Sequence, residues 1–231
     1  MSFRRPTLAI SLVTLVALAI LIGLGTWQLQ RLHWKTDLLA RIAAHRDAAP
    51  VPLPADLSEP AEWDYRPVTV TGRFLDPQMP LVGRQHAGAL GYQLVMPLER
   101  ADGAGFVLVN RGWVPLDRLD PATRPDPMAA GEVTVTGLAR VPPAPGWMAP
   151  ANQPERNLWY SVDIDGMAAH AFLSRTAPVV VEAGPTPEGE LPVGGQTVLN
   201  IPNNHLQYVF TWYAFATVLV GIFIAYHWRR P

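Results

Sequence analysis

The side chain best suited to chemistry in this chain is the imidazole of His205, at the start of the last apolar segment. The amides of Asn203 and Asn204 precede it and Tyr208 follows it, before the apolar run Val209–Trp228. Histidine titrates near neutral pH and binds metals through a ring nitrogen, and ionisable groups at a membrane span are commonly functional. We therefore take His205 as the first candidate ligand for a metal or cofactor.

We expect a helix to begin at His205, with the Asn204 side chain capping its first turn. On that helix, Tyr208, Trp212 and Phe215 share roughly one face, at i+3, i+7 and i+10 from His205. An imidazole on iron above such an aromatic stripe would hold a haem. The same residues would also form an ordinary aromatic belt at a membrane surface, with the histidine turned to water or lipid.

A second candidate set lies at the end of the first apolar segment. Trp27, Arg31, Trp34 and Lys35 recur at i, i+4, i+7 and i+8, so a helix would carry them on one face. The two cations would pair with carboxylates of a bound ligand, such as the propionates of haem. They would serve equally as partners for lipid phosphates, and the residues alone leave both roles open.

Two apolar segments must position these side chains. Leu8–Thr26 and Val209–Trp228 are each about 20 residues long, enough to cross a hydrocarbon core of ~30 Å as a helix. A cleaved signal peptide is the rival interpretation of the first segment, but its apolar run is long and no small-residue cleavage site follows it. Gly23 and Gly25 would let this segment pack closely against a second helix.

The stretch between the two segments is predicted to be a β-rich domain. Residues 31–205 hold 14 basic and 19 acidic residues, a net charge of −5, which disfavours a nucleic-acid surface. The chain has 24 prolines, 18 glycines and no cysteine, so loops are long and disulfides are excluded. We expect a tail at 1–7, a transmembrane helix at 8–27, a helical extension at 28–48, the β-rich domain at 49–206, a transmembrane helix at 207–228 and a tail at 229–231.

Short runs of β-forming residues bounded by turn residues predict the strands of this domain. We expect them at Arg66–Phe74, Pro80–Gln85, Gly91–Leu98, Gly105–Trp113, Glu132–Val141, Pro178–Glu182 and Thr197–Ile201, with a helix at Asp165–Leu173. The pentapeptide Val-Thr-Val-Thr-Gly begins at both Val68 and Val133, and we favour chance recurrence of a β-former over duplication. The expected fold class is membrane α+β: a two-helix transmembrane hairpin bracketing an antiparallel β-rich domain with one short helix.

The sequence gives little support for an enzyme. It holds no Gly-x-Ser-x-Gly, Walker-type loop, dinucleotide fingerprint or paired-histidine metal motif. Asp163, Asp165 and His170 could form an acid–base cluster, but no nucleophile motif lies nearby, and capping or solvated roles suit them better. We predict a non-enzyme, with a membrane-bound enzyme of unknown chemistry as the alternative that variants of Asp163 and His170 would test.

Six segments, taken together and in this order, resemble the Surfeit locus protein 1 family of membrane assembly factors for haem-copper cytochrome c oxidase. They are distributed along nearly the whole chain, from Gly25 to Tyr213. They are Gly25–Arg31 with Trp34 and Lys35, Tyr65–Val68, Asn110–Pro115, Pro154–Asn157 with Trp159, Gly194–Thr197, and Asn203–Tyr208 with Thr211–Tyr213.

The resemblance implies that the protein delivers haem a to the catalytic subunit of the oxidase or aids its insertion there, with haem a as transient cargo. In bacterial members a histidine of the last motif is implicated in haem binding, and it maps onto His205. The implied partners are that catalytic subunit, haem A synthase and membrane lipid. A scaffold that stabilises an oxidase assembly intermediate without touching haem is the alternative.

Around a haem held by His205, we expect Arg31 or Lys35 to neutralise the propionates and aromatic side chains to pack the ring. The aromatic candidates are Trp27, Tyr208 and Trp212, beside Phe215. These assignments are our inference from the helical spacing and are not carried over from the resemblance.

The expected location is a bacterial inner membrane. Arginine outnumbers lysine 17 to 1 and the first span begins at Leu8, which leaves no room for a transit peptide. Positive charges flank both sides of the first span, so charge alone does not orient the protein. The resemblance resolves this, because it implies cytoplasmic termini and a periplasmic central domain.

Overall fold

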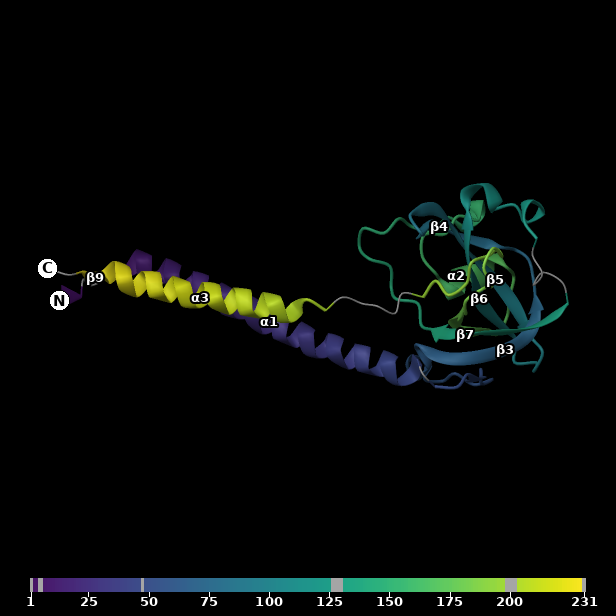
Figure 1. The fold of residues 1–231 in the computed structure, drawn as a ribbon, viewed down its shortest axis with the longest axis horizontal. Helices are drawn as coiled ribbons and strands as arrows, with labels where there is room; N and C mark the ends of the chain where they lie inside the picture. The colour runs from purple at the N-terminus through teal and green to yellow at the C-terminus, as the bar shows by residue number, and fades with distance from the viewer. Residues whose placement is uncertain (1, 4–5, 47, 126–130, 198–202, 230–231) are drawn as a thin grey trace. The chain divides into compact units, whose positions relative to one another are not determined.

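The computed structural model describes residues 2–3, 6–46, 48–125, 131–197 and 203–229, and it divides into two compact units. The first unit contains 1–41 and 199–231, and the second contains 42–198. Figure 1 shows a helix pair in the first unit and a curved sheet in the second.

Two long helices make up most of the first unit. Helix α1, Leu8–Arg46, has 39 residues, and helix α3, His205–His227, has 23. They run antiparallel. The short strands β1 (Ser2–Phe3) and β9 (Trp228–Arg229) pair with each other beside the N-terminal end of α1 and the C-terminal end of α3. Both helices are long and apolar enough to cross a membrane. The prediction that the first apolar helix continues without a break into its polar extension is confirmed.

The second unit is built on a seven-stranded sheet in the order β2-β3-β7-β8-β6-β5-β4. Its strands are β2 (Val51–Pro52), β3 (Arg66–Phe74), β4 (Met79–His86), β5 (Ala89–Arg100), β6 (Phe106–Pro115), β7 (Glu132–Arg140) and β8 (Thr176–Ala183). Short 3-10 helices interrupt the loops at η1 (Pro60–Trp63), η2 (Leu116–Arg118), η3 (Pro121–Thr123) and η4 (Pro154–Arg156).

The sheet closes on itself, because β3 pairs with β5 as well as with β7. Closure runs through β3, β7, β8, β6 and β5, so these strands form a barrel around a common core. At the closing point a Cβ on Gly72 would lie 2.0 Å from the carbonyl oxygen of Glu99. Only glycine allows the two strands to approach this closely there.

The expectation of an antiparallel sheet is wrong in two places. Strand β6 pairs with β8 in parallel, and β2 pairs with β3 in parallel; the other pairings in this sheet are antiparallel. The parallel partner β8 carries Val179, Val180 and Val181, all buried. Burial of consecutive residues means that both faces of the strand are covered, as is usual for parallel strands.

The two Val-Thr-Val-Thr-Gly segments pair with each other across β3 and β7. Val68 lies opposite Gly137 and Gly72 opposite Val133, so the apolar row of each segment faces the same side. The hydroxyls of Thr71 and Thr134 lie 2.8 Å apart on the other side. The recurrence therefore has a local role as a matched cross-strand pair.

Two hydrophobic clusters stabilise this unit. The first fills the barrel, with Val68, Leu98, Val107 and Val179 fully buried. The second packs helix α2 (Ile164–His170) onto the sheet through side chains that include Met79, Trp159 and Met167.

Six of the expected strands and the short helix are present, with bounds shifted by at most three residues. The strand expected at Thr197–Ile201 falls almost entirely outside the described residues. Strand β2 was not predicted, because it has only two residues and prolines lie on both sides of Val51.

Candidate functional site

Helix α3 begins at His205, as the sequence predicts. The predicted side-chain cap is wrong: Asn204 occupies the N-cap position but its side chain makes no capping hydrogen bond. The φ and ψ angles of Asn204 are −97° and 9°, outside the extended region from which a cap side chain reaches back to the first turn. His205 is therefore positioned by a contact other than the cap.

That contact comes from helix α1. His205 Nδ1 lies 2.7 Å from Gln28 Oε1, and Gln28 is buried. An amide oxygen only accepts hydrogen bonds, so the ring proton sits on Nδ1. In the neutral imidazole, the lone pair of Nε2 then remains for accepting a hydrogen bond or binding a metal, which is the arrangement that metal-ligating histidines adopt.

A close approach of the two helices supports this contact. A Cβ on Gly25 would lie 2.8 Å from the ring of Tyr213, so glycine lets the ring pack on the α1 backbone. The Thr26 hydroxyl lies 3.3 Å from the Tyr213 hydroxyl. The prediction of close packing holds for Gly25 but not for Gly23, whose added Cβ would meet nothing within 4 Å.

Two polar atoms near the start of α3 are buried and lack a hydrogen-bond partner among the described residues. They are Asn203 Oδ1, two residues before His205, and Trp212 Nε1, seven residues after it. On a helix, positions i and i+7 lie on the same side, two turns apart. The Trp212 ring also meets the Phe215 ring edge-on at 6.2 Å. A donor, an acceptor and an aromatic face therefore accompany the imidazole.

The second candidate set forms a stack on an exposed face of α1. The Arg31 guanidinium lies 5.8 Å from the Trp27 ring and 5.3 Å from the Trp34 ring. Both tryptophans are about half exposed, and Lys35 is partly buried. Arg31 is one helical turn from Gln28, so the stack and the His205 contact lie on neighbouring faces of one helix.

Tyr208 is exposed on α3, one turn after His205. Phe215, further along the same helix, is similarly exposed. The structure thus brings His205 and Gln28 into contact, and it stacks Trp27, Arg31 and Trp34 together elsewhere on α1; Trp212 lies two turns beyond His205 on α3. Gln28 is the member that the sequence prediction missed, because nothing in the sequence links it to a partner 177 residues away.

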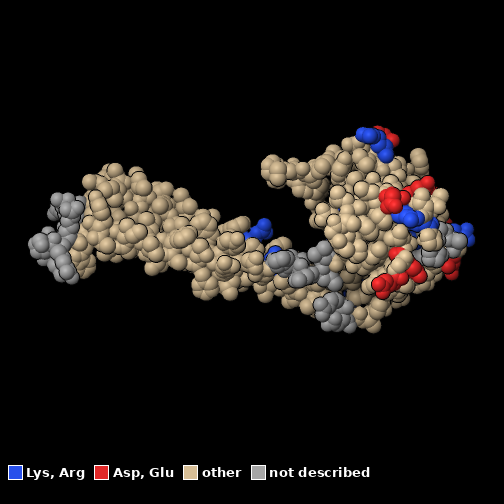
Figure 2. Space-filling view, turned by 45° about the horizontal axis from the view of Figure 1, so that its top comes forward, with Lys and Arg blue, Asp and Glu red and all other residues tan. Residues whose placement is uncertain are grey.

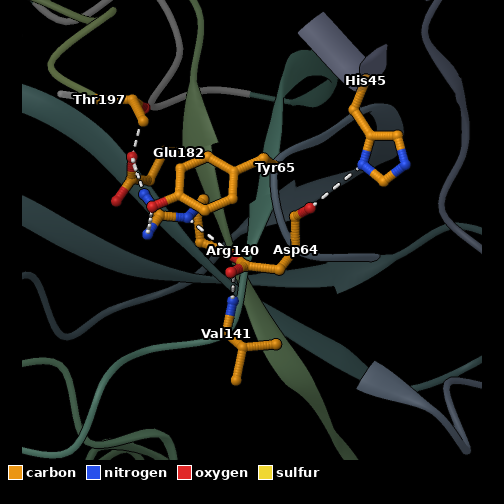
Figure 3. Close-up of polar contacts among 7 residues, drawn as sticks. All are labelled: His45, Asp64, Tyr65, Arg140, Val141, Glu182 and Thr197. Carbon is orange, nitrogen blue, oxygen red and sulfur yellow. Dashed lines mark hydrogen bonds and ion pairs between the residues drawn. The ribbon is translucent and has the colours of Figure 1, made fainter. Parts of the chain in front are cut away.

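A separate polar cluster organises the sheet unit (Figure 3). Arg140 donates from Nε to Asp64 at 2.9 Å and from Nη2 to the Tyr65 hydroxyl at 3.0 Å, and its Nη1 lies 3.6 Å from Glu182. Its guanidinium also stacks on the Tyr65 ring at 3.8 Å. Glu182 in turn accepts a hydrogen bond from Thr197.

This Arg140 cluster binds the segment that leads into β3 and the segment that follows β8. His45, near the end of α1, contacts the backbone oxygen of Asp64 at 3.4 Å, while Thr197 is the last described residue before 203. Tyr65 and Thr197 belong to motifs quoted in the sequence analysis. Their structural role is to tie these two chain ends to β7 and β8.

The remaining sequence candidates have structural roles. Asp163 caps α2 by accepting from Gly166 N at 3.0 Å, and the His170 ring packs edge-on against Trp159 at 5.7 Å. Arg156, which belongs to one of the six segments, donates to Gln153 Oε1 at 3.1 Å. Among the residues that the structure describes, no group of three or more His, Cys, Asp or Glu side chains is placed to hold a metal ion.

Burial perturbs one cation of the sheet unit. Desolvation lowers the pKa of the Arg84 guanidinium, and the negative charge of Glu182 partly opposes this effect. Arg84 Nη2 donates to the backbone oxygen of Tyr160 at 3.1 Å. The side chain thus fastens a loop to β4, which is a structural role.

Comparison with known proteins gives a match over most of the chain. The model of the SURF1 family matches residues 15–217. Surfeit locus protein 1 of Rattus norvegicus is 38% identical over 209 residues, which cover 83% of this chain and 67% of the relative. The human protein of that name is 37% identical over 83% of this chain and 68% of its own length. A SURF1-like protein of Monosiga brevicollis is 35% identical, with 87% and 81% covered.

Proposed function

The chain belongs to the SURF1 family, and on that premise we propose that it is an assembly factor for haem-copper cytochrome c oxidase. In this proposal it holds haem a and aids its insertion into the catalytic subunit. The observation that carries the haem-binding part is the hydrogen bond from His205 Nδ1 to Gln28 Oε1, which leaves Nε2 available for iron.

The proposed location is a bacterial inner membrane crossed by α1 and α3. Large apolar side chains cover the outside of both helices; Val13 is 68% exposed and Val218 is 56% exposed. A helix in the core of a soluble protein would bury such side chains, whereas a lipid-facing helix exposes them. We place both termini in the cytoplasm and the sheet unit in the periplasm, with Arg4, Arg5, Arg229 and Arg230 on the cytoplasmic side.

The residues near His205 fit a haem. When bound, haem a would supply an iron centre that the His205 imidazole could ligate. Trp212 and Phe215 offer an apolar aromatic surface on the same helix, and Trp212 Nε1 and Asn203 Oδ1 are buried polar atoms with no partner among the described residues. A ligand with both an apolar body and polar groups would satisfy these atoms.

Arg31 and Lys35 would pair with the propionates, because both lie on the turns of α1 that follow Gln28. Trp27 and Tyr208 would flank the cargo from the exposed faces. Coordination by a single protein ligand suits a carrier, because the cargo must dissociate when an acceptor protein offers its own ligands. The sheet unit would then recognise the catalytic subunit of the oxidase or haem A synthase.

The test is complementation of a deletion strain of the source bacterium. The wild-type protein, His205→Ala and the control His33→Ala are expressed, and the haem a content of the purified oxidase is measured. His33 is exposed on α1 and outside the proposed site. We expect His205→Ala to reduce haem a in the oxidase while His33→Ala restores it. Full restoration by His205→Ala would indicate a haem-independent scaffold and overturn the proposal.

A further inference from the structure

The loop between β7 and η4 exposes two large apolar side chains. From 141 to 154 the chain carries no Asp, Glu, Lys or Arg, and prolines recur along it. Trp147 is 91% exposed and Met148 is 75% exposed. This segment, coloured green in Figure 1, projects from the sheet unit without regular secondary structure. It is not part of the proposed haem site.

The loop is anchored at its base and presents its tip. At one end Val141 N donates to Asp64 at 3.1 Å. At the other end the Asn152 carboxamide accepts from Tyr160 N at 2.8 Å. A turn closed by Ala149 N and the Gly146 oxygen, 2.8 Å apart, places Trp147 and Met148 at its two central positions. Proline fixes φ along both arms, so the tip loses little entropy on binding.

The size and chemistry of this tip fit a bilayer surface better than a protein surface. Two such side chains offer about 400 Å² of apolar area at most, against ~800 Å² per partner in a stable protein interface. Tryptophan is the side chain most characteristic of the headgroup region, where its ring meets apolar chains and its N–H meets water. The uncharged surroundings mean that no charge must be desolvated when the tip enters that region. In the space-filling view, the charged side chains of the sheet unit gather on other parts of its surface (Figure 2).

We propose that the turn carrying Trp147 and Met148 inserts into the headgroup region of the phospholipid bilayer that holds α1 and α3. This inference rests on the proposed membrane anchoring. The sheet unit is joined to an apolar helix at each end, so the loop is tethered to the bilayer that holds these helices. The effective concentration of lipid around the loop is therefore high. Insertion would give the sheet unit a third attachment and thereby limit its orientation relative to the membrane.

Because the chain contains no cysteine, a single introduced cysteine can carry an environment-sensitive fluorophore at one defined position. We would label the full-length variants Met148→Cys, Glu188→Cys and Val218→Cys in phosphatidylcholine nanodiscs with and without nitroxide-labelled lipid. Glu188 is exposed on another loop and serves as the water reference, and Val218 in α3 serves as the membrane reference.

We expect emission from position 148 to be blue-shifted and quenched by nitroxide lipid, unlike emission from 188. Adding Trp147→Ser to Met148→Cys should weaken both effects, because the ring is the main anchor. If 218 is quenched while 148 behaves like 188, the loop inference is wrong and the anchoring stands. If 148 is shielded from a water-soluble quencher but not quenched by lipid, a protein covers the loop and the inference is also wrong. Absence of quenching at 218 would overturn the anchoring and, with it, the proposed function.

Discussion

His205 Nδ1 and Gln28 Oε1 lie 2.7 Å apart and join the first turn of α3 to the middle of α1. This one contact sets three properties of the imidazole: which nitrogen is protonated, how the ring is oriented, and which helix it depends on. Every part of the proposed haem site therefore depends on how the two helices pack.

The first prediction concerns Gln28 as the residue that orients the imidazole. Gln28→Leu removes the acceptor for Nδ1–H, and loss of such a partner typically weakens metal affinity about 10- to 100-fold. We expect haem titration of the purified variant to show a loss of this order, while Gln28→Glu, which keeps an acceptor, retains binding. Gln30→Leu is the matched control, since Gln30 is exposed on the same helix. Equal affinity of Gln28→Leu and Gln30→Leu would remove Gln28 from the site.

The second prediction compares two glycines of α1. Gly25→Ala places a methyl group against the Tyr213 ring, and overpacking of this kind typically destabilises by about 1–3 kcal/mol. Gly23→Ala adds a methyl group in open space and should be neutral or slightly stabilising. The measurement is the unfolding midpoint of each variant in detergent, followed by haem titration. If both variants behaved alike, close helix packing would not explain why a glycine occupies position 25.

The third prediction concerns the Arg140 cluster. Arg140→Leu leaves Asp64 and Glu182 without their cation. We expect a loss of about 2 kcal/mol, less than the ~3–5 kcal/mol of a fully buried pair because these side chains are partly exposed. Arg140→Lys keeps the charge but not the planar fork or the stacking on Tyr65, so its loss should be intermediate. Chemical denaturation of the full-length protein measures both variants.

Asp117→Asn is the control for that series, because it removes a solvent-exposed ion pair with Arg118. Exposed pairs contribute about 0–1 kcal/mol, so this variant should unfold close to the wild type. A loss in Arg140→Leu no larger than in Asp117→Asn would show that the cluster does not stabilise the sheet unit.

The fourth prediction is a pH dependence that arises at Asp102. Desolvation opposes its ionisation, but the hydrogen bonds from Arg100 and Ala104 N, with the charge of Arg100, together hold the pKa of the Asp102 carboxyl below its usual range. A lowered folded-state pKa means that the carboxylate contributes stability above the unfolded value of ~3.9 and loses it as the pH falls through the folded value. Asp102→Asn should therefore be less stable than wild type at pH 7, and the difference should shrink below about pH 4. Unfolding curves between these pH values test this; a constant difference would contradict it.

Most helices and strands could be predicted from patterns of neighbouring residues in the sequence. Alternation of valine and threonine predicted β3 and β7, and the long uncharged runs predicted α1 and α3, because these signals depend only on neighbouring residues. Strand direction was not accessible in the same way. The consecutive valines Val179–Val181 are typical of a parallel strand, but such a run also occurs in other buried segments and does not name the partner strand.

The candidate site was predicted only in part, for a physical reason. His205 stands out because its residue type and position in the chain are informative without knowledge of its neighbours. Gln28 and the Arg140 cluster act through side chains that meet only after folding, and no local pattern reports such contacts. The capping prediction failed because it depends on the backbone angles of Asn204, which the residue type alone does not determine.

The central claim is that His205 ligates haem a through Nε2. The most direct measurement is the optical absorption spectrum of the full-length protein, purified in detergent after co-expression with the enzymes that make haem A. Wild type, His205→Ala and the control His33→Ala are compared. We predict a haem a spectrum in the wild type and in His33→Ala, and its loss or a shift of its bands in His205→Ala. An unchanged spectrum in His205→Ala, or no haem in any of the three, would contradict the claim.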